Sequence, residues 1–165
     1  MPASSPEPAV QRLIFGALLT KTDSALIEND VPPEPGHDLL TLRIEKLLEG
    51  GAYRQALDLY NTIAEDTYNA RLARAGILAM MLTGEKSLAC LEANTVENKF
   101  SQSEFIKQVA AFCDVTLSPQ PNETAKKILL GANLRHLDAL TLAGATIPYN
   151  PQTFAQLSLT ERAFL

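Results

Sequence analysis

The sequence has neither a long run of Lys and Arg nor a long apolar run, and both absences narrow its possible functions. Its 165 residues hold 14 Lys and Arg against 19 Asp and Glu, for a formal net charge of −5. Binding to nucleic acid or to an anionic membrane surface depends on positive charge, so we expect neither partner. The longest apolar stretch, Leu13 to Leu19, is too short to span a bilayer and is followed by Lys21 and Asp23.

Cysteine is scarce, with Cys90 and Cys113 as the only two. Their spacing fits neither a zinc site nor a thioredoxin-like redox motif. The sequence also shows no nucleophile with a nearby base and no converging set of metal ligands. We therefore expect a protein that is not an enzyme and that holds no metal and no cofactor.

A secretory signal peptide is absent from the first residues, which have neither a basic start nor an apolar run. Residues 1–8 have the composition of a Pro/Ser-rich linker instead. Met1 fits the native start of a cytoplasmic protein, and it equally fits a residue added in front of a piece of a longer chain. The absence of a signal therefore leaves the location open.

Strand-like alternation is almost absent, whereas helical periodicity extends from about residue 8 to about residue 143. The sequence predicts an all-α fold, with a single helical-repeat domain over 9–165. A proline suits the first position of a helix, so the first helix should begin at Pro8. Its apolar stripe has helical spacing and consists of Val10, Leu13, Ile14, Ala17 and Leu18.

A short sequence pattern, called a phrase below, occurs twice, 33 residues apart. Gly51-Ala52-Tyr53 is followed by Ala56-Leu57, and Gly84-Glu85-Lys86 is followed by Ala89-Cys90. Each phrase follows one helical segment and opens another, and glycine is suited to the left-handed turn between them. A period of this size is typical of stacked helix-turn-helix units, which present a surface to another macromolecule.

These phrases define two units, at about 37–66 and 68–97. Their paired antiparallel helices are expected over 37–49 with 52–65 and over 68–83 with 85–96. In the last of these helices the apolar stripe consists of Leu88, Ala89, Leu91 and Ala93. Ala56 and Ala89 occupy matching places, and their small size would let two helices approach closely.

Degenerate units follow over 101–144. A helix after Ser101 or Ser103 carries Phe105, Ile106, Val109, Ala110, Phe112 and Cys113. Asn122 should cap the next helix, Glu123 to Gly131, and a further helix carries Leu134 to Ala143. Thr153 to Leu165 should form one or two short turns, capped by Ser158 or Thr160.

The first unit resembles a tetratricopeptide repeat. The resemblance is carried by Leu40, Leu47-Leu48, the turn Gly51-Ala52-Tyr53, Ala56-Leu57 and Tyr60, and the second unit is similar from Gly84 to Ala89. Ile44 and Ile77 stand where that family has a small residue. The resemblance implies a right-handed stack of antiparallel helix pairs, a fragment of an α-solenoid.

In tetratricopeptide arrays the first helix of each pair lines a concave face, where polar side chains often hold a peptide. Arg43, Arg71 and Arg74 all fall on such first helices, and Arg is favoured at binding hot spots and for carboxylate capture. They are candidate partner-binding residues. The alternative is exposed charge that interacts with Glu45 or Glu49 nearby.

The later segment is similar to uncharacterised helical-repeat proteins of the bacterial cell envelope. The similarity is carried by Phe105, Ala111-Phe112-Cys113, Ile128-Leu129-Leu130 and the stretch from Leu134 to Pro148. It implies no biochemical role.

Cys90 and Cys113 lie on either side of a helix connection near 97–101, on helices that would run antiparallel. They are expected to face each other. One alternative is a disulfide, which would imply an oxidising compartment. The other is a pair of buried free thiols that pack as small hydrophobes.

Together these features predict a non-catalytic protein–protein interaction or scaffold domain, in a bacterial assembly of the periplasm or cell envelope. A helical accessory domain of an envelope enzyme is one alternative. A cytoplasmic chaperone or adaptor for a secreted substrate is another. A Cys90–Cys113 bridge would favour the two envelope hypotheses.

Overall fold

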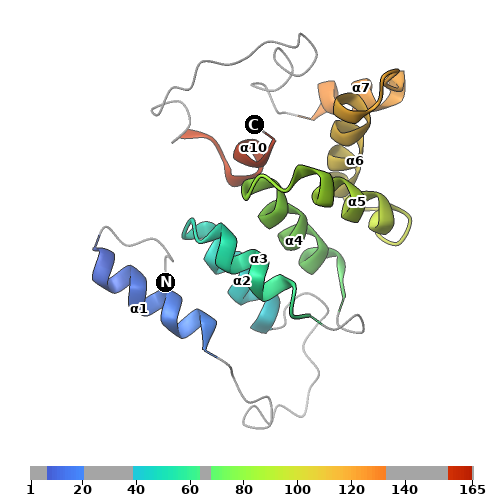
Figure 1. The fold of residues 1–165 in the computed structure, drawn as a ribbon. Helices are drawn as coiled ribbons and strands as arrows, with labels where there is room; N and C mark the ends of the chain where they lie inside the picture. Colours follow the sequence, from blue (N-terminus) through green and yellow to red (C-terminus); the bar gives the residue numbers. More distant parts are fainter. Residues whose placement is uncertain (1–6, 21–38, 64–67, 133–155, 165) are drawn as a thin grey trace. The chain divides into compact units, whose positions relative to one another are not determined.

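The computed structural model describes residues 7–20, 39–63, 68–132 and 156–164 (Figure 1). Every regular element within these ranges is a helix, so the all-α prediction is confirmed for the described residues. The helix expected from Leu134 to Ala143 and most of the linker at 1–8 lie outside them. The chain forms two compact units, Met1–Ala79 and Met80–Leu165.

The first unit contains α1 (Pro8–Leu19), α2 (Leu39–Glu49), α3 (Tyr53–Tyr60) and the start of α4 (Ala70–Leu82). Pro8 occupies the start of α1, as expected. Gln11 near the start of α1 donates a hydrogen bond to the carbonyl oxygen of Gly50 just after α2, at 3.1 Å. Arg43 on α2 bonds to the other end of α1, so the two helices run antiparallel.

No residue of α1 is buried, although the spacing of its apolar side chains predicts one buried stripe. Gln11, Ile14, Phe15 and Leu18 are partly covered, whereas Val10, Leu13 and Ala17 are exposed. The two groups lie on adjoining sides of the helix, because successive residues are about 100° apart around its axis. Only one side of the predicted stripe is therefore covered.

Helix α2 ends in a Schellman motif, in which the last carbonyl groups accept two bonds from the residues after the helix. The amide of Gly51 donates to the carbonyl oxygen of Leu48, and the amide of Ala52 donates to that of Leu47. Gly51 has φ +80°, a conformation that favours glycine because it has no Cβ. The motif lets α3 begin directly afterwards, at Tyr53.

Helix α3 ends at Tyr60, earlier than the expected limit at residue 65. The amides of Thr62 and Ile63 bond to carbonyl groups three residues back, and the Thr62 hydroxyl also donates to the carbonyl oxygen of Leu59. Such i to i+3 bonds tighten the chain out of the α-helical path. Ile63 therefore lies in a turn after the helix rather than on its apolar face.

Helices α3 and α4 approach closely at Gly76, which lies against the Tyr60 ring. A Cβ atom placed at Gly76 would lie 2.7 Å from the Cδ2 atom of the Tyr60 ring and closer still to two further ring carbons. The Tyr60 hydroxyl lies 2.6 Å from that of Tyr68, which holds the ring in place. Gly76 is therefore the small residue that lets α4 lie close to the Tyr60 ring. The adjacent Ile77, which stands where tetratricopeptide repeats have a small residue, is fully buried.

The second unit contains the end of α4, α5 (Lys86–Glu97), α6 (Glu104–Leu117), α7 (Glu123–Gly131) and α10 (Leu159–Ala163). Helix α4 ends in the same turn as α2. The amide of Gly84 donates to the carbonyl oxygen of Met81 and the amide of Glu85 to that of Met80, with Gly84 at φ +84°. The two similar phrases thus have the same turn geometry.

Helix α5 turns a different face inward from the one expected. Its buried residues are Ala89, Cys90, Ala93 and Val96. Leu88 and Leu91 are 51% and 66% exposed, because they point to the opposite side of the helix. The expected stripe was wrong for these two leucines. Its two alanines are buried, and so is Ala56 on α3.

Candidate functional site in the arginines of α2 and α4 and the disulfide between α5 and α6

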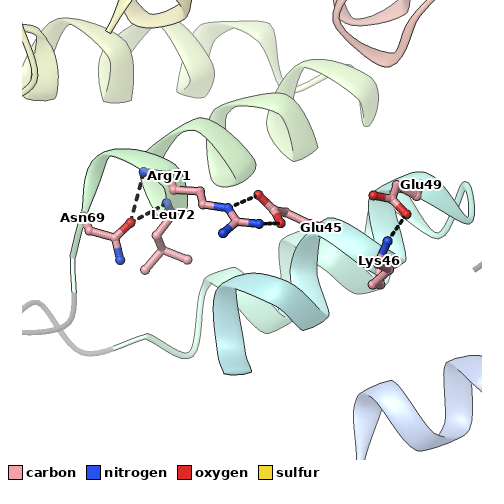
Figure 2. Close-up of polar contacts among 6 residues, drawn as sticks. All are labelled: Glu45, Lys46, Glu49, Asn69, Arg71 and Leu72. Carbon is pink, nitrogen blue, oxygen red and sulfur yellow. Dashed lines mark hydrogen bonds and ion pairs between the residues drawn. The ribbon is translucent and has the colours of Figure 1, made fainter. Parts of the chain in front are cut away.

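Arg71 is positioned by the first turn of α4. The side-chain oxygen of Asn69 accepts hydrogen bonds from the amides of Arg71 and Leu72, at 3.0 and 2.9 Å (Figure 2). Asparagine is among the best residues for capping a helix start in this way. The cap sets where α4 begins and so directs the Arg71 side chain toward α2.

The Arg71 guanidinium makes a two-pronged ion pair with Glu45 of α2 (Figure 2). Its Nε donates to Oε1 at 2.7 Å and its Nη2 donates to Oε2 at 2.5 Å. The two side chains are 35% and 28% exposed, so water screens the pair only in part. The parallel bonds match the planar fork of Arg to a carboxylate, which gives directional specificity as well as attraction. Arg71 therefore makes the ion pair with Glu45 that the sequence analysis named as the alternative to partner binding.

Glu49, the other acidic residue named as an alternative partner, bonds to its own helix neighbour. Lys46 donates to its carboxylate at 2.5 Å (Figure 2). Both side chains are well exposed, and an i, i+3 pair of this kind contributes only a few tenths of a kcal/mol. It is a surface pair that leaves the Arg71–Glu45 contact undisturbed.

Arg43 lies on α2 but binds the end of α1. Its guanidinium donates to the backbone carbonyl oxygens of Leu18 and Thr20, the latter at 2.6 Å. The last carbonyl groups of a helix lack partners within the helix and carry a partial negative charge. Arg43 satisfies two of these carbonyl groups at the end of α1, which ties α1 to α2.

Arg74 lies on the exposed side of α4, one turn after Arg71. The three arginines thus occupy the predicted helices, but Arg43 and Arg71 bond to different groups inside the first unit. Binding of a partner by these residues stays a prediction. The sequence pointed to Glu45 as one alternative partner, and it held no sign of the tie between Arg43 and α1.

Cys90 of α5 and Cys113 of α6 form a disulfide, with Sγ atoms 2.03 Å apart and Cα atoms 5.6 Å apart. The prediction that they lie on neighbouring helices and face each other is confirmed. Both are buried, at 5% and 3% exposure. The surrounding protein therefore largely shields the bridge from solvent. The structure therefore contains the disulfide rather than the alternative of two buried free thiols.

Two phenylalanine rings of α6 pack against the Phe164 ring. Phe112, next to Cys113, lies 5.2 Å from the Phe164 ring between centroids, and Phe105 lies 6.4 Å from it. The Lys86 ammonium is 6.0 Å from the Phe112 ring centroid. Periodicity places Phe105 and Phe112 on one face of α6, but it gives no sign that Phe164, 52 positions after Phe112, covers them.

The described residues contain no group of three or more His, Cys, Asp or Glu side chains placed to hold a metal ion. Nor does any helix in these ranges combine the length and apolar character needed to cross a membrane.

A scan of protein-family models finds no match to the chain. Comparison with curated proteins finds no similar sequence. Comparison with solved structures likewise finds no similar fold.

Proposed function

We propose that the chain is a non-catalytic protein–protein interaction domain with a tetratricopeptide-like stack of helix pairs, and that it serves in a bacterial envelope-associated assembly. The observation that carries the proposal is the pair of identical Schellman turns at Gly51 and Gly84, 33 positions apart. Each turn joins two helices by a short, defined connection. Repeated helix pairs of this kind act by shape recognition rather than by chemistry.

Two further observations support a rigid scaffold. The contact between Gly76 and Tyr60 brings α4 close to α3, as the small residues of such repeats do. The Arg71–Glu45 pair links α4 to α2, and the Asn69 cap fixes the start of α4. A rigid surface costs less entropy to bind than a flexible one.

The disulfide supports an oxidising location such as the periplasm. Disulfides persist in oxidising compartments and are rare where thiols are kept reduced. It therefore favours the two envelope hypotheses, an assembly component or an accessory domain of an envelope enzyme, over a cytoplasmic adaptor.

Photo-crosslinking in cells that express the protein natively tests the interaction. A photoreactive amino acid at Arg74, exposed on α4, should yield one or a few discrete crosslinked proteins. The matched control is Arg54, which is exposed on α3. Because α3 is the second helix of its pair and only first helices would line the binding face, no adduct is expected there. Equal labelling at both positions, or none at Arg74, would count against a binding surface on the first helices.

Thiol trapping tests the location. Cells are quenched in acid and the denatured protein is alkylated before and after reduction. Cys90 and Cys113 should be unreactive before reduction and reactive after it. Free thiols in the native cell would contradict the envelope location and leave the cytoplasmic adaptor as the better hypothesis.

A further inference from the structure

Helix α5 of the second unit has little local support of its own. Glu85, the residue before it, makes no side-chain cap bond to the helix. Its first residue is Lys86 and its last is Glu97, so each charge lies at the end of the helix dipole where it is unfavourable. The other described helices that lie wholly in this unit have a favourable glutamate in the first turn, namely Glu104, Glu123 and Glu161. A helix of 12 residues without such support is marginal alone in water.

The inward face of α5 also supplies little apolar surface. It consists of Ala89, Cys90, Ala93 and Val96, whereas the two leucines of this helix are mostly exposed. Stabilisation by burial grows with the apolar area of a side chain, so two alanines and a valine hold a helix in place less firmly than leucines would. The covalent bond from Cys90 to Cys113 of α6 therefore carries a large share of the attachment of α5.

Other contacts of the second unit contain no residue of α5. The rings of Phe105 and Phe112 on α6 pack against that of Phe164, at 6.4 and 5.2 Å between centroids. Helix α6 also packs against α7, and the amide of Asn122, the cap of α7, donates a hydrogen bond to the Asp114 carboxylate at 2.7 Å. These contacts join α6, α7 and the segment 156–164 without the bridge.

We propose that the bridge between Cys90 and Cys113 is a redox switch for α5. In the oxidised chain α5 is a helix docked on α6. In the reduced chain α5 leaves α6 and loses its helical structure, while α6, α7 and the segment 156–164 stay folded together. The switch lies in the second unit and is independent of the proposed interaction function.

A dithiol operates the switch by thiol–disulfide exchange. One of its thiolates attacks a sulfur atom of the bridge and forms a mixed disulfide, which breaks the bond between Cys90 and Cys113. Its second thiol then displaces the protein sulfur and closes a disulfide within the dithiol. Two electrons and two protons thus pass to the protein, which leaves both cysteines as free thiols. Because both cysteines are buried, the exchange proceeds through brief local openings.

Release of α5 changes the surface that α6 presents. Ile106 and Val109 lie one and two turns before Cys113, on the same side of the helix. Both are fully buried in the oxidised chain. The conformational entropy that the released helix regains opposes the loss of this burial. The redox state would therefore decide whether this apolar side of α6 is covered.

Hydrogen exchange read by mass spectrometry tests the switch in the full chain. Three forms are compared: the oxidised chain, the chain reduced with dithiothreitol, and the Cys90→Ala/Cys113→Ala variant. In the last two, the amides of α5 should exchange within about tenfold of the unfolded-chain rate, whereas those of α6 and α7 should stay at least about a hundredfold slower. Dithiothreitol should not alter exchange in the variant, which controls for effects of the reagent itself.

Two results would overturn the proposal. One is an α5 that keeps its protection after complete reduction, because its packing would then hold it without the bridge. The other is an equal loss of protection in α5, α6 and α7, because the bridge would then support the whole unit rather than switch one helix. Neither result bears on the crosslinking at Arg74, which lies in the first unit, so the two proposals fail separately.

Discussion

At the residue scale, single contacts decide how closely the helices approach. Gly76 is the clearest case, because the Tyr60 ring occupies the space where any other residue would place its Cβ. Tyr60 is itself buried and its hydroxyl lies against that of Tyr68, so the ring has little room to move. The identity of residue 76 is thus set by its neighbour on α3 rather than by helix propensity.

Gly76→Ala should therefore lower the free energy of unfolding by about 1–3 kcal/mol, the usual cost of overpacking a core. The control is Gly16→Ala in α1, where no atom lies within 4 Å of the new Cβ. That change should leave stability unchanged or raise it by about 0.5–1 kcal/mol, because Ala favours the helix. Denaturant unfolding of both variants measures the difference, and equal stability would contradict the close contact.

The ion pair between Arg71 and Glu45 should contribute modestly. A double-mutant cycle of Arg71→Met and Glu45→Gln is expected to give a coupling free energy of about 0.5–1.5 kcal/mol, since the pair is two-pronged and partly buried. Arg54 and Asp58 on α3 are the control pair, 3.6 Å apart and about two-thirds exposed. Their coupling should be near zero. A larger coupling for the control pair would show that burial is not what strengthens the contact.

At the element scale, the caps of α7 and α10 follow local sequence signals, whereas the inward face of α5 does not. Asn122 caps α7 as expected, and Ser158, one of the two expected candidates, caps α10, because a cap depends on residues two or three positions away. The inward face of α5 depends on which helices surround it. Leu88 and Leu91 fit an apolar stripe as well as Ala89 and Ala93 do, so periodicity alone could not choose between the two sides.

The same reasoning explains the outcome at the candidate site. The positions of Arg43, Arg71 and Arg74 on their helices were predictable from helix ends and period. Glu45, the partner of Arg71, had been named only as one alternative, and the bonds from Arg43 to Leu18 and Thr20 were not foreseen, because they join α2 to another helix 23 to 25 positions earlier in the chain. The facing of Cys90 and Cys113 was predictable because a single short connection joins their helices. Phe164 lies too far along the chain from α6 for a similar argument.

The cap positions of α6 and α7 give a matched test of helix capping. Asn122→Ala should cost about 1 kcal/mol, because the side-chain oxygen of Asn122 accepts a bond from the Thr124 amide at 2.9 Å. Ser103→Ala should change stability by less than about 0.5 kcal/mol, since Ser103 occupies the cap position of α6 without a side-chain cap bond. Thermal melts followed by circular dichroism compare the two. A greater loss for Ser103→Ala would contradict the assigned caps.

Helix α7 also carries a pH-sensitive pair. A hydrogen bond from Lys126 to Glu123, together with the charge of Lys126, lowers the pKa of Glu123. A carboxylate with a lowered pKa stabilises the fold at pH values above its unfolded-state pKa, and this contribution is lost as pH falls through the folded-state pKa. Titration of the Glu123 carboxyl carbon by NMR should give a lower midpoint in the original chain than in Lys126→Met.

At the scale of the whole molecule, the disulfide should stabilise the fold more than any of the single contacts described above. It closes a loop with a sequence separation of 23, for which the chain-entropy estimate is about 3 kcal/mol. The Cys90→Ala/Cys113→Ala double variant should therefore melt well below the original chain. Reductant should lower the melting temperature of the original chain toward that of the variant and leave the variant unchanged. If full reduction, verified by alkylation and mass, leaves the melt unaltered, the bridge does not stabilise the fold.

The bridge also determines how the molecule would transmit mechanical force. When the chain is pulled from its two ends, tension passes from Cys90 directly to Cys113 across the sulfur atoms, and the residues between them carry none. A stretch with a sequence separation of 23 would otherwise extend to about 80 Å, so the stretched protein is shorter by nearly that length. The connection between α5 and α6 is thus protected from tension even after the surrounding helices have unravelled.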